Sequence, residues 1–183
     1  MTIVNVGVSC RTAPAGVLEK LAVLPGEGIG MMARMHAMSA IDEVFILSTC
    51  DRVEVYATTR LPPEEATWAV AGALAARGRI PVSDLLQLAG INFGAAAAEH
   101  LFSVTSGLDS MAMGAEQIVA RVEAAQQDAT AAGTTGLVLT DLVEAALRAS
   151  KRARSETAIG TGQLAGLRHR RRVALFMPAT GSR

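Results

Sequence analysis

The chain has 183 residues, enough for one sizeable hydrophobic core or for a domain with an appendage, and too few for two full enzyme domains. Half of the residues are hydrophobic, but no apolar run reaches the roughly 18 residues of a membrane span, and the first ten residues lack a secretory signal. The formal net charge is zero, and the two cysteines, Cys10 and Cys50, are typical of free thiols in a reducing cytoplasm. We therefore expect a helix-rich, globular, cytoplasmic protein that does not contact membranes.

The N-terminal part predicts a strand followed by a helix. Residues 3–9 alternate between apolar and polar side chains, which is typical of a strand. Residues 11–23 carry apolar side chains at helical spacing, with Thr12 as the expected N-cap and Pro14 in the first turn.

A glycine-rich stretch interrupts the helical pattern at residues 25–30. Its glycines do not follow a strand, so they predict a loop and not a phosphate-binding turn. The methionine-rich helix that comes next carries His36, which has no second ligand near it and is predicted to lie on the surface. We predict no metal site.

Two strands meet at a polar corner in the centre of the chain. Residues 44–47 form a continuous apolar run, typical of a strand covered on both faces, and residues 53–56 alternate as in a strand with one covered face. A cysteine at such a corner, here Cys50, is placed like a nucleophile, and Arg52 can stabilise its thiolate or bind an anionic substrate group. The alternative is an inert core cysteine, because cysteine is among the most often buried residue types.

The remainder predicts helices. Residues 64–78 form one candidate helix and residues 81–90 a shorter one, and three further helical stretches follow at about 94–106, 114–132 and 137–159. This order predicts an α+β fold in which a small sheet is flanked by helices and followed by a helical segment.

Basic residues are concentrated near the C-terminal end. Residues 148–172 contain eight basic side chains and one acid, which leaves nine basic and sixteen acidic residues elsewhere. Such a cluster can bind nucleic-acid phosphates, or it can be a solvated helix face. The glycines at 160, 162 and 166 follow a helix and not a strand, so they do not form a dinucleotide-binding motif. Residues 161–183 are expected to form a divergent, disordered tail.

Four ordered blocks of sequence carry a resemblance to a known family. They are GVSCRTAP at 7–14, LSTCDRVEVY at 47–56, HLFSVTSGLDSMAMGAEQI at 100–118 and KRARSETAIG at 151–160. Together they resemble glutamyl-tRNA reductase, the enzyme that starts the five-carbon route to tetrapyrroles such as porphyrins. Members of that family have a catalytic N-terminal domain, a long spinal helix, an NADPH-binding domain and a dimerisation domain. The resemblance implies that residues 1–135 are the catalytic domain and that residues 136–160 begin the spinal helix.

The resemblance also implies roles for individual residues. Cys50 is expected to attack the ester carbonyl of glutamyl-tRNA and to form a glutamyl thioester, which the full-length family reduces with NADPH to glutamate-1-semialdehyde. His100 is expected to act as acid or base near the thiol, the alternative being a histidine satisfied by packing. The expected substrate-binding residues are Thr49, Arg52, Ser110 and Gln117. The expected phosphate contacts with tRNA are Arg148, Lys151, Arg152 and Arg154.

The chain departs from the family pattern in three motifs. An acid beside the thiol, Asp51 in place of asparagine, opposes thiolate formation. The other replacements are Val53 for threonine in S-T-C-N-R-T-E, Ser9, Cys10 and Arg11 in G-x-N-H-K-T-A-P, and Ala115 and Glu116 in G-E-P-Q-I.

These departures leave two alternatives open. The chain could be a stand-alone acyl transferase or esterase that uses an aminoacyl-tRNA, or a non-catalytic module that binds tRNA or a protein partner. In every case we expect the chain itself to bind no cofactor and to be a monomer, because the NADPH-binding and dimerisation domains of the family would be missing.

Overall fold

The computed structural model describes residues 1–24, 26–109 and 115–156, and an antiparallel sheet of four strands lies at its centre. The strands are β1 (Thr2–Ser9), β2 (Ile41–Ser48), β3 (Arg52–Thr59) and β4 (Gly90–Phe93), in the spatial order β2-β3-β1-β4. In the register of the two inner strands, Ser9 pairs with Arg52 and Gly7 with Glu54.

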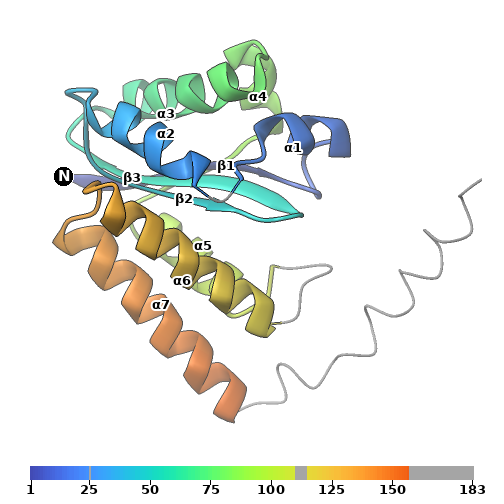
Figure 1. Ribbon diagram of the computed structural model, residues 1–183, viewed down its shortest axis with the longest axis vertical. Helices are drawn as coiled ribbons and strands as arrows, with labels where there is room; N and C mark the ends of the chain where they lie inside the picture. Colours follow the sequence, from blue (N-terminus) through green and yellow to red (C-terminus); the bar gives the residue numbers. More distant parts are fainter. Residues whose placement is uncertain (25, 110–114, 157–183) are drawn as a thin grey trace, which may run out of the picture.

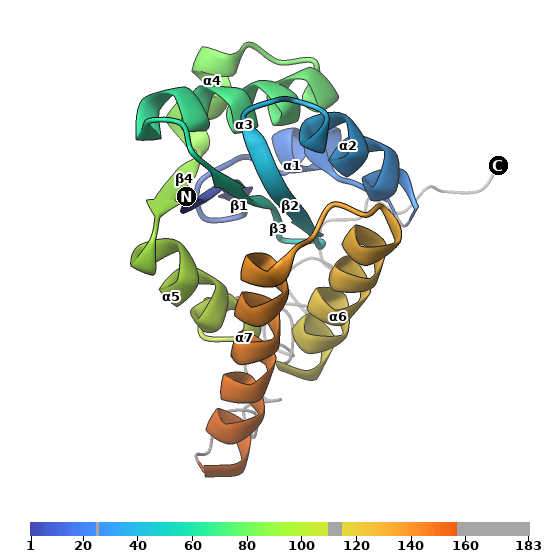
Figure 2. The ribbon, with the colours of Figure 1, turned by 90° about the vertical axis from the view of Figure 1, so that its left-hand side faces the viewer.

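Helices cover both faces of the sheet (Figure 1). One face carries α1 (Ala15–Leu21), α2 (Glu27–His36), α3 (Pro63–Gly78) and α4 (Val82–Leu88). The other carries α5 (Ala95–Thr105), α6 (Ala115–Ala131) and α7 (Leu137–Glu156), and Figure 2 shows α7 between α5 and α6, both of which it contacts. The predicted α+β class is confirmed.

The two faces of strand β3 differ in polarity. Successive side chains of a strand point to opposite faces, so Val53 and Val55 lie on one side and Glu54 and Tyr56 on the other. Glu54 contacts His100 of α5, so the polar side faces α5. The prediction of one covered face is wrong: all eight residues of β3 are buried, because helices pack on both sides. The predicted double coverage of residues 44–47 is confirmed.

The predicted start of the first helix is wrong. Helix α1 begins at Ala15 with Pro14 as its N-cap, and Thr12 caps nothing. A residue before proline is disfavoured in helical backbone, which delays the start of the helix until after Pro14. The Thr12 hydroxyl accepts a hydrogen bond from the Ser9 N–H at 3.2 Å instead.

The predicted glycine-rich loop is largely helical. Helix α2 starts at Glu27 and includes Gly28 and Gly30, while Gly26 at its N-cap has a φ of 84°, which glycine adopts without strain. The surface position predicted for His36 is confirmed, because this residue is exposed.

Strand β4 is absent from the predicted elements. It has four residues, too few to reveal an alternating pattern. Its existence depends on pairing with β1, in which Asn92 lies opposite Asn5 and Gly90 opposite Gly7.

Glu43 of β2 anchors the beginning of α7. Its carboxylate is buried and accepts hydrogen bonds from the backbone N–H groups of Val138 at 3.2 Å and Leu139 at 2.7 Å. A negative charge is favourable at a helix N-terminus. A Cβ at Gly136 would lie 2.7 Å from the Glu43 carboxylate, so glycine is needed there. The predicted end of this helix at residues 157–160 and the predicted tail at 161–183 lie outside the described residues.

Within the described ranges, every helix is too short or too polar to cross a membrane.

Candidate functional site

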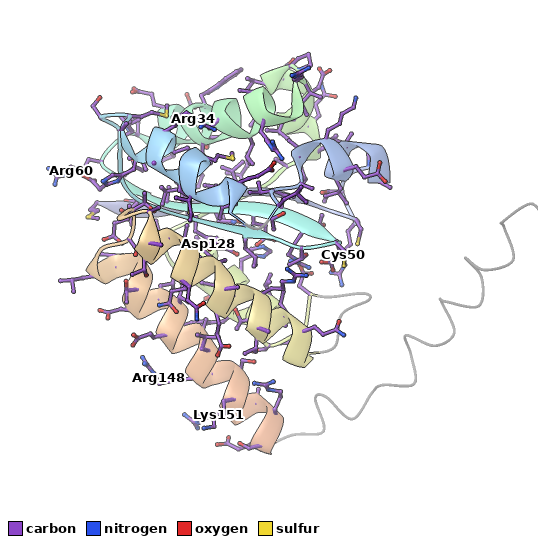
Figure 3. All side chains as sticks on the ribbon, in the orientation of Figure 1. Arg34, Cys50, Arg60, Asp128, Arg148 and Lys151 are labelled. Carbon is purple, nitrogen blue, oxygen red and sulfur yellow. The ribbon has the colours of Figure 1, made fainter. Side chains whose placement is uncertain are left out.

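Cys50 and Asp51 form a two-residue turn that joins β2 to β3. The hairpin is closed by a hydrogen bond from the Thr49 N–H to the Arg52 carbonyl at 2.9 Å. Cys50 is an exposed free thiol and lies at the tip of the sheet in Figure 3. The alternative prediction, an inert cysteine buried in the core, is therefore wrong. The second exposed cysteine, Cys10, lies beside this turn, because its N–H donates to the Asp51 carbonyl at 2.8 Å.

The carboxylate of Asp51 is held by its neighbours. The Thr49 hydroxyl donates a hydrogen bond to Asp51 Oδ1 at 2.6 Å, and the Asp51 N–H donates to the same hydroxyl at 3.3 Å. The Arg52 Nε lies 3.7 Å from Asp51 Oδ1. The carboxylate of Asp51 is therefore buried and faces a cation.

Arg52 is the cationic centre of the site, with only 1% of its side chain exposed. Its Nη1 lies 3.0 Å from Glu54 Oε1 and 2.9 Å from Asp109 Oδ2, and its Nη2 donates to the Asp109 carbonyl at 2.6 Å. Burial acts to lower the pKa of Arg52, but the charge of Glu54 and the hydrogen bond to Asp109 outweigh it and leave the pKa raised. The guanidinium stays charged although it is buried.

Glu54 connects Arg52 to two aromatic rings. Its Oε1 lies 3.0 Å from His100 Nε2, and its Oε2 accepts a hydrogen bond from the Tyr56 hydroxyl at 2.7 Å. The hydrogen bond to Glu54 raises the pKa of His100, against a smaller effect of burial. Burial, reinforced by the charge of Glu54, raises the pKa of Tyr56 well above its ordinary value. These interactions favour a charged His100 and a neutral Tyr56.

A pocket of about 160 Å³, lined in part by polar side chains, opens beside this network. It lies on the α5 side of the sheet, and Cys50 is at the adjacent turn, outside the pocket lining. The side chains that line it and carry charge or can carry it are Arg11, Glu54, His100 and Asp109.

The floor of the pocket includes two glycines, Gly7 of β1 and Gly90 of the paired strand β4, which contribute no side chains. A Cβ at Gly7 would lie 2.6 Å from Glu54 Cγ and 2.8 Å from the Val53 carbonyl, so no larger residue fits beside Glu54. At Gly90 the nearest atom, the Gly7 carbonyl oxygen, is 3.9 Å away, so that position has room. Asn92 Nδ2 next to it donates to Asn5 Oδ1 at 3.0 Å.

The structure brings some of the predicted site residues together. Cys50 and Thr49 share the turn, and Arg52 and His100 both contact Glu54. Gln117 is exposed on α6, and Ser110 lies outside the described residues. The roles of these side chains stay predictions.

The four basic residues predicted to contact tRNA lie on α7. Figure 3 labels two of them, Arg148 and Lys151, and shows both well away from Cys50. Arg148 pairs with Glu144 at 3.3 Å and Arg152 with Glu156 at 3.2 Å, one turn along the same helix. Arg154 Nε donates to the Ser150 carbonyl at 3.3 Å, and Lys151 is exposed.

Three polar residues of the network are missing from the predicted site. Glu54 and Tyr56 could have been found from the pattern of β3, because they follow Arg52 at intervals of two residues and so share its face. Asp109 is 57 residues from Arg52 in the sequence, and no local pattern points to its contact.

The comparisons with known proteins agree on one family. The family model described as glutamyl-tRNAGlu reductase, N-terminal domain, matches residues 6–157. Glutamyl-tRNA reductase of Salinispora arenicola is 40% identical over 159 residues, which are 87% of this chain and 35% of that protein. The enzyme of Corynebacterium diphtheriae is 38% identical over 159 residues, 87% of this chain and 36% of that protein.

A solved structure extends the likeness to the fold. Glutamyl-tRNA reductase from Methanopyrus kandleri superposes with a TM-score of 0.66 at 30% identity, over 85% of this chain and 35% of that one. The chain thus spans about a third of the length of these relatives. It belongs to the glutamyl-tRNA reductase family and corresponds to the N-terminal domain of that family.

Proposed function

We propose that this chain is the catalytic domain of a glutamyl-tRNA reductase, in which Cys50 takes the glutamyl group from glutamyl-tRNA as a thioester. One observation carries the proposal. The Cys50 thiol is exposed on a two-residue turn, and Arg52, two residues further along the chain, belongs to a buried network with Glu54 and His100. In this proposal residues 1–135 form the catalytic domain, residues 136–160 begin a spinal helix, and residues 161–183 are a tail.

The proposed step is an acyl transfer from oxygen to sulfur. The Cys50 thiolate attacks the ester carbonyl, a bond forms between Sγ and the carbonyl carbon, and the bond from that carbon to the ribose oxygen breaks. The leaving oxygen needs a proton, which His100 supplies, since its raised pKa favours the protonated ring at neutral pH. The glutamyl group is held by Thr49, Arg52, Ser110 and Gln117.

The reduction of the thioester belongs to another part of the family's longer chain. In the full-length enzymes NADPH supplies the hydride that converts the thioester to glutamate-1-semialdehyde. Dinucleotides bind at parallel β-α-β units, and the sheet described in this chain is antiparallel throughout, so its residues do not fit that cofactor. The step proposed for the domain described here is therefore thioester formation, followed by slow hydrolysis when no hydride is supplied.

Intact-protein mass spectrometry after mixing with glutamyl-tRNA tests the proposal. Wild type should gain the mass of one glutamyl group, and hydroxylamine should remove it, because thioesters are cleaved by that nucleophile. Cys50→Ser should give no hydroxylamine-labile adduct. Cys10→Ser is the matched control, because Cys10 is the other exposed thiol at the same turn.

Two results would contradict the assignment. An adduct that persists in Cys50→Ser and is lost in Cys10→Ser would move the nucleophile to Cys10. The absence of an adduct from wild type, with tRNA still bound, would favour a binding module.

The role of His100 has its own test. His100→Gln should slow adduct formation by about a hundredfold or more while tRNA affinity stays unchanged, because general acid catalysis contributes on the order of 10² to 10⁴. An unchanged rate would remove His100 from the mechanism.

We also propose that the basic side chains of α7 contact tRNA phosphates. Exposed ion pairs within one helix are weak, so the pairs of Arg148 and Arg152 can exchange for phosphate at little cost. Changing Lys151 to Gln should weaken tRNA binding and reduce the slope of log K against log salt by roughly one unit. Arg60→Gln is the control, because Arg60 is also exposed but lies just after β3, far from Lys151 (Figure 3). An equal salt slope for both variants would exclude this face.

A further inference from the structure

The carboxylate of Asp109 lies between two arginines. Its Oδ2 is 2.9 Å from Arg52 Nη1, and its Oδ1 accepts a hydrogen bond from Arg11 Nη1. The two arginines differ in exposure, since 1% of the Arg52 side chain and 46% of the Arg11 side chain are accessible to solvent. The two arginines therefore place positive charge both at the surface and at the buried centre of the site, and both attract carboxylates.

Asp109 is placed so that another carboxylate could take its position. Its side chain is 24% exposed, and it borders the pocket of about 160 Å³ together with Arg11 and His100. It lies in the segment after α5, four residues beyond the end of that helix at Thr105.

We propose that Arg11 and Arg52 form one carboxylate-binding site, which Asp109 occupies in the free protein and which the side-chain carboxylate of the acyl donor takes over by displacing Asp109. This inference rests on the proposed function for the identity of the donor. It adds Arg11 as a specificity-determining residue and makes Asp109 an internal competitor of the substrate.

The charges around Arg52 support an exchange of one carboxylate for another. Arg52 keeps Glu54 at 3.0 Å and Asp51 at 3.7 Å when Asp109 leaves, so the buried guanidinium is never without a negative partner. Entry of a second carboxylate without displacement would crowd like charges around one cation, which is unfavourable. A neutral ligand gains nothing from replacing Asp109, so the exchange selects for acidic side chains.

Titration calorimetry with glutarate, a five-carbon dicarboxylate, measures this site without tRNA. Asp109→Asn removes the competing charge and should tighten glutarate binding by about tenfold, since apparent affinity is reduced by the fraction of protein in which the site is closed. Arg11→Gln removes the exposed arginine and should weaken binding by roughly tenfold, the usual effect of losing one hydrogen bond to a charged group.

A second arginine–aspartate pair provides matched controls. Arg60 Nε lies 3.5 Å from Asp42 Oδ2, at the opposite end of the sheet from Cys50 (Figure 3). Asp42→Asn and Arg60→Gln make the same chemical changes and should leave glutarate binding unchanged.

The outcomes separate this inference from the proposed function. Unchanged or weaker glutarate binding by a folded Asp109→Asn variant overturns the inference, as does the absence of binding to both wild type and this variant. If Asp109→Asn does not fold, Arg11→Gln decides, and unchanged binding by that variant overturns the inference. A glutamyl adduct on Cys50 with no effect of either variant refutes the displacement alone, whereas tighter glutarate binding by Asp109→Asn without any adduct supports the carboxylate site and refutes the proposed function.

Discussion

Arg52 and Glu54 form an ion pair inside the protein, with Nη1 and Oε1 3.0 Å apart and side-chain exposures of 1% and 4%. They are two residues apart on one face of β3, so the strand itself holds them in register. Removing two charges from water is unfavourable unless further hydrogen bonds satisfy them. Asp109 supplies these for Arg52, and His100 and Tyr56 supply them for Glu54. These hydrogen bonds therefore stabilise the buried ion pair.

Replacing Glu54 with glutamine should destabilise the protein by about 3 kcal/mol, because it leaves a buried arginine and a partly buried histidine without their shared anion. Urea unfolding measures the change. Glu144→Gln is the control, since Glu144 pairs with Arg148 on the surface and its loss should cost less than about 0.5 kcal/mol. Equal effects of the two variants would show that the buried cluster adds no stability.

His100 should make the stability of the protein depend on pH. Its pKa is raised in the folded state, so its contribution is fully present below the unfolded value of about 6.5 and is lost as pH rises through the folded value. The difference in unfolding free energy between wild type and His100→Gln should therefore shrink from pH 6 to pH 9. His36→Gln, at an exposed histidine, should show no such trend. A difference that is constant with pH would contradict the contact with Glu54.

Tyr56 should resist ionisation as long as the protein is folded. It is the one tyrosine of the chain, so the rise in absorbance at 295 nm with pH reports its ionisation, because Trp68 absorbs there but does not ionise. Burial and Glu54 raise its pKa, so its contribution to stability is present below the unfolded value of about 10 and is lost above it. We expect tyrosinate to form together with unfolding in water, and near pH 10 in concentrated urea. Ionisation near pH 10 with an unchanged circular dichroism spectrum would contradict this.

The two glycines of the pocket floor should respond differently to the same change. Gly7→Ala places a Cβ within 3 Å of Glu54 and of the Val53 carbonyl, and should cost roughly 1–3 kcal/mol. Gly90→Ala meets no atom closer than 3.9 Å and should leave stability nearly unchanged while narrowing the pocket. Thermal unfolding separates the two variants. Equal stability of both would mean that Glu54 does not pack against β1.

The elements with strong local patterns agree with the structure. The alternation at residues 3–9, the apolar run at 44–47 and the helical spacing at 64–78 appear as β1, β2 and α3. Patterns of this kind arise because each element has a fixed periodicity of side chains. Helix α1 and strand β4 deviate, since their boundaries depend on a proline and on pairing with a distant strand.

The amino-acid sequence by itself determined that Cys50 and Arg52 share a corner between two strands, because residues so close along a chain cannot separate. Its motifs also indicated the family that the comparisons then established. Only the tertiary structure decided what surrounds Arg52. Its partner Asp109 is far away in sequence, as is His100 of α5, which contacts the neighbouring Glu54. Ion pairs of this kind form only when packing excludes water from both partners, and no local pattern of residues encodes that condition.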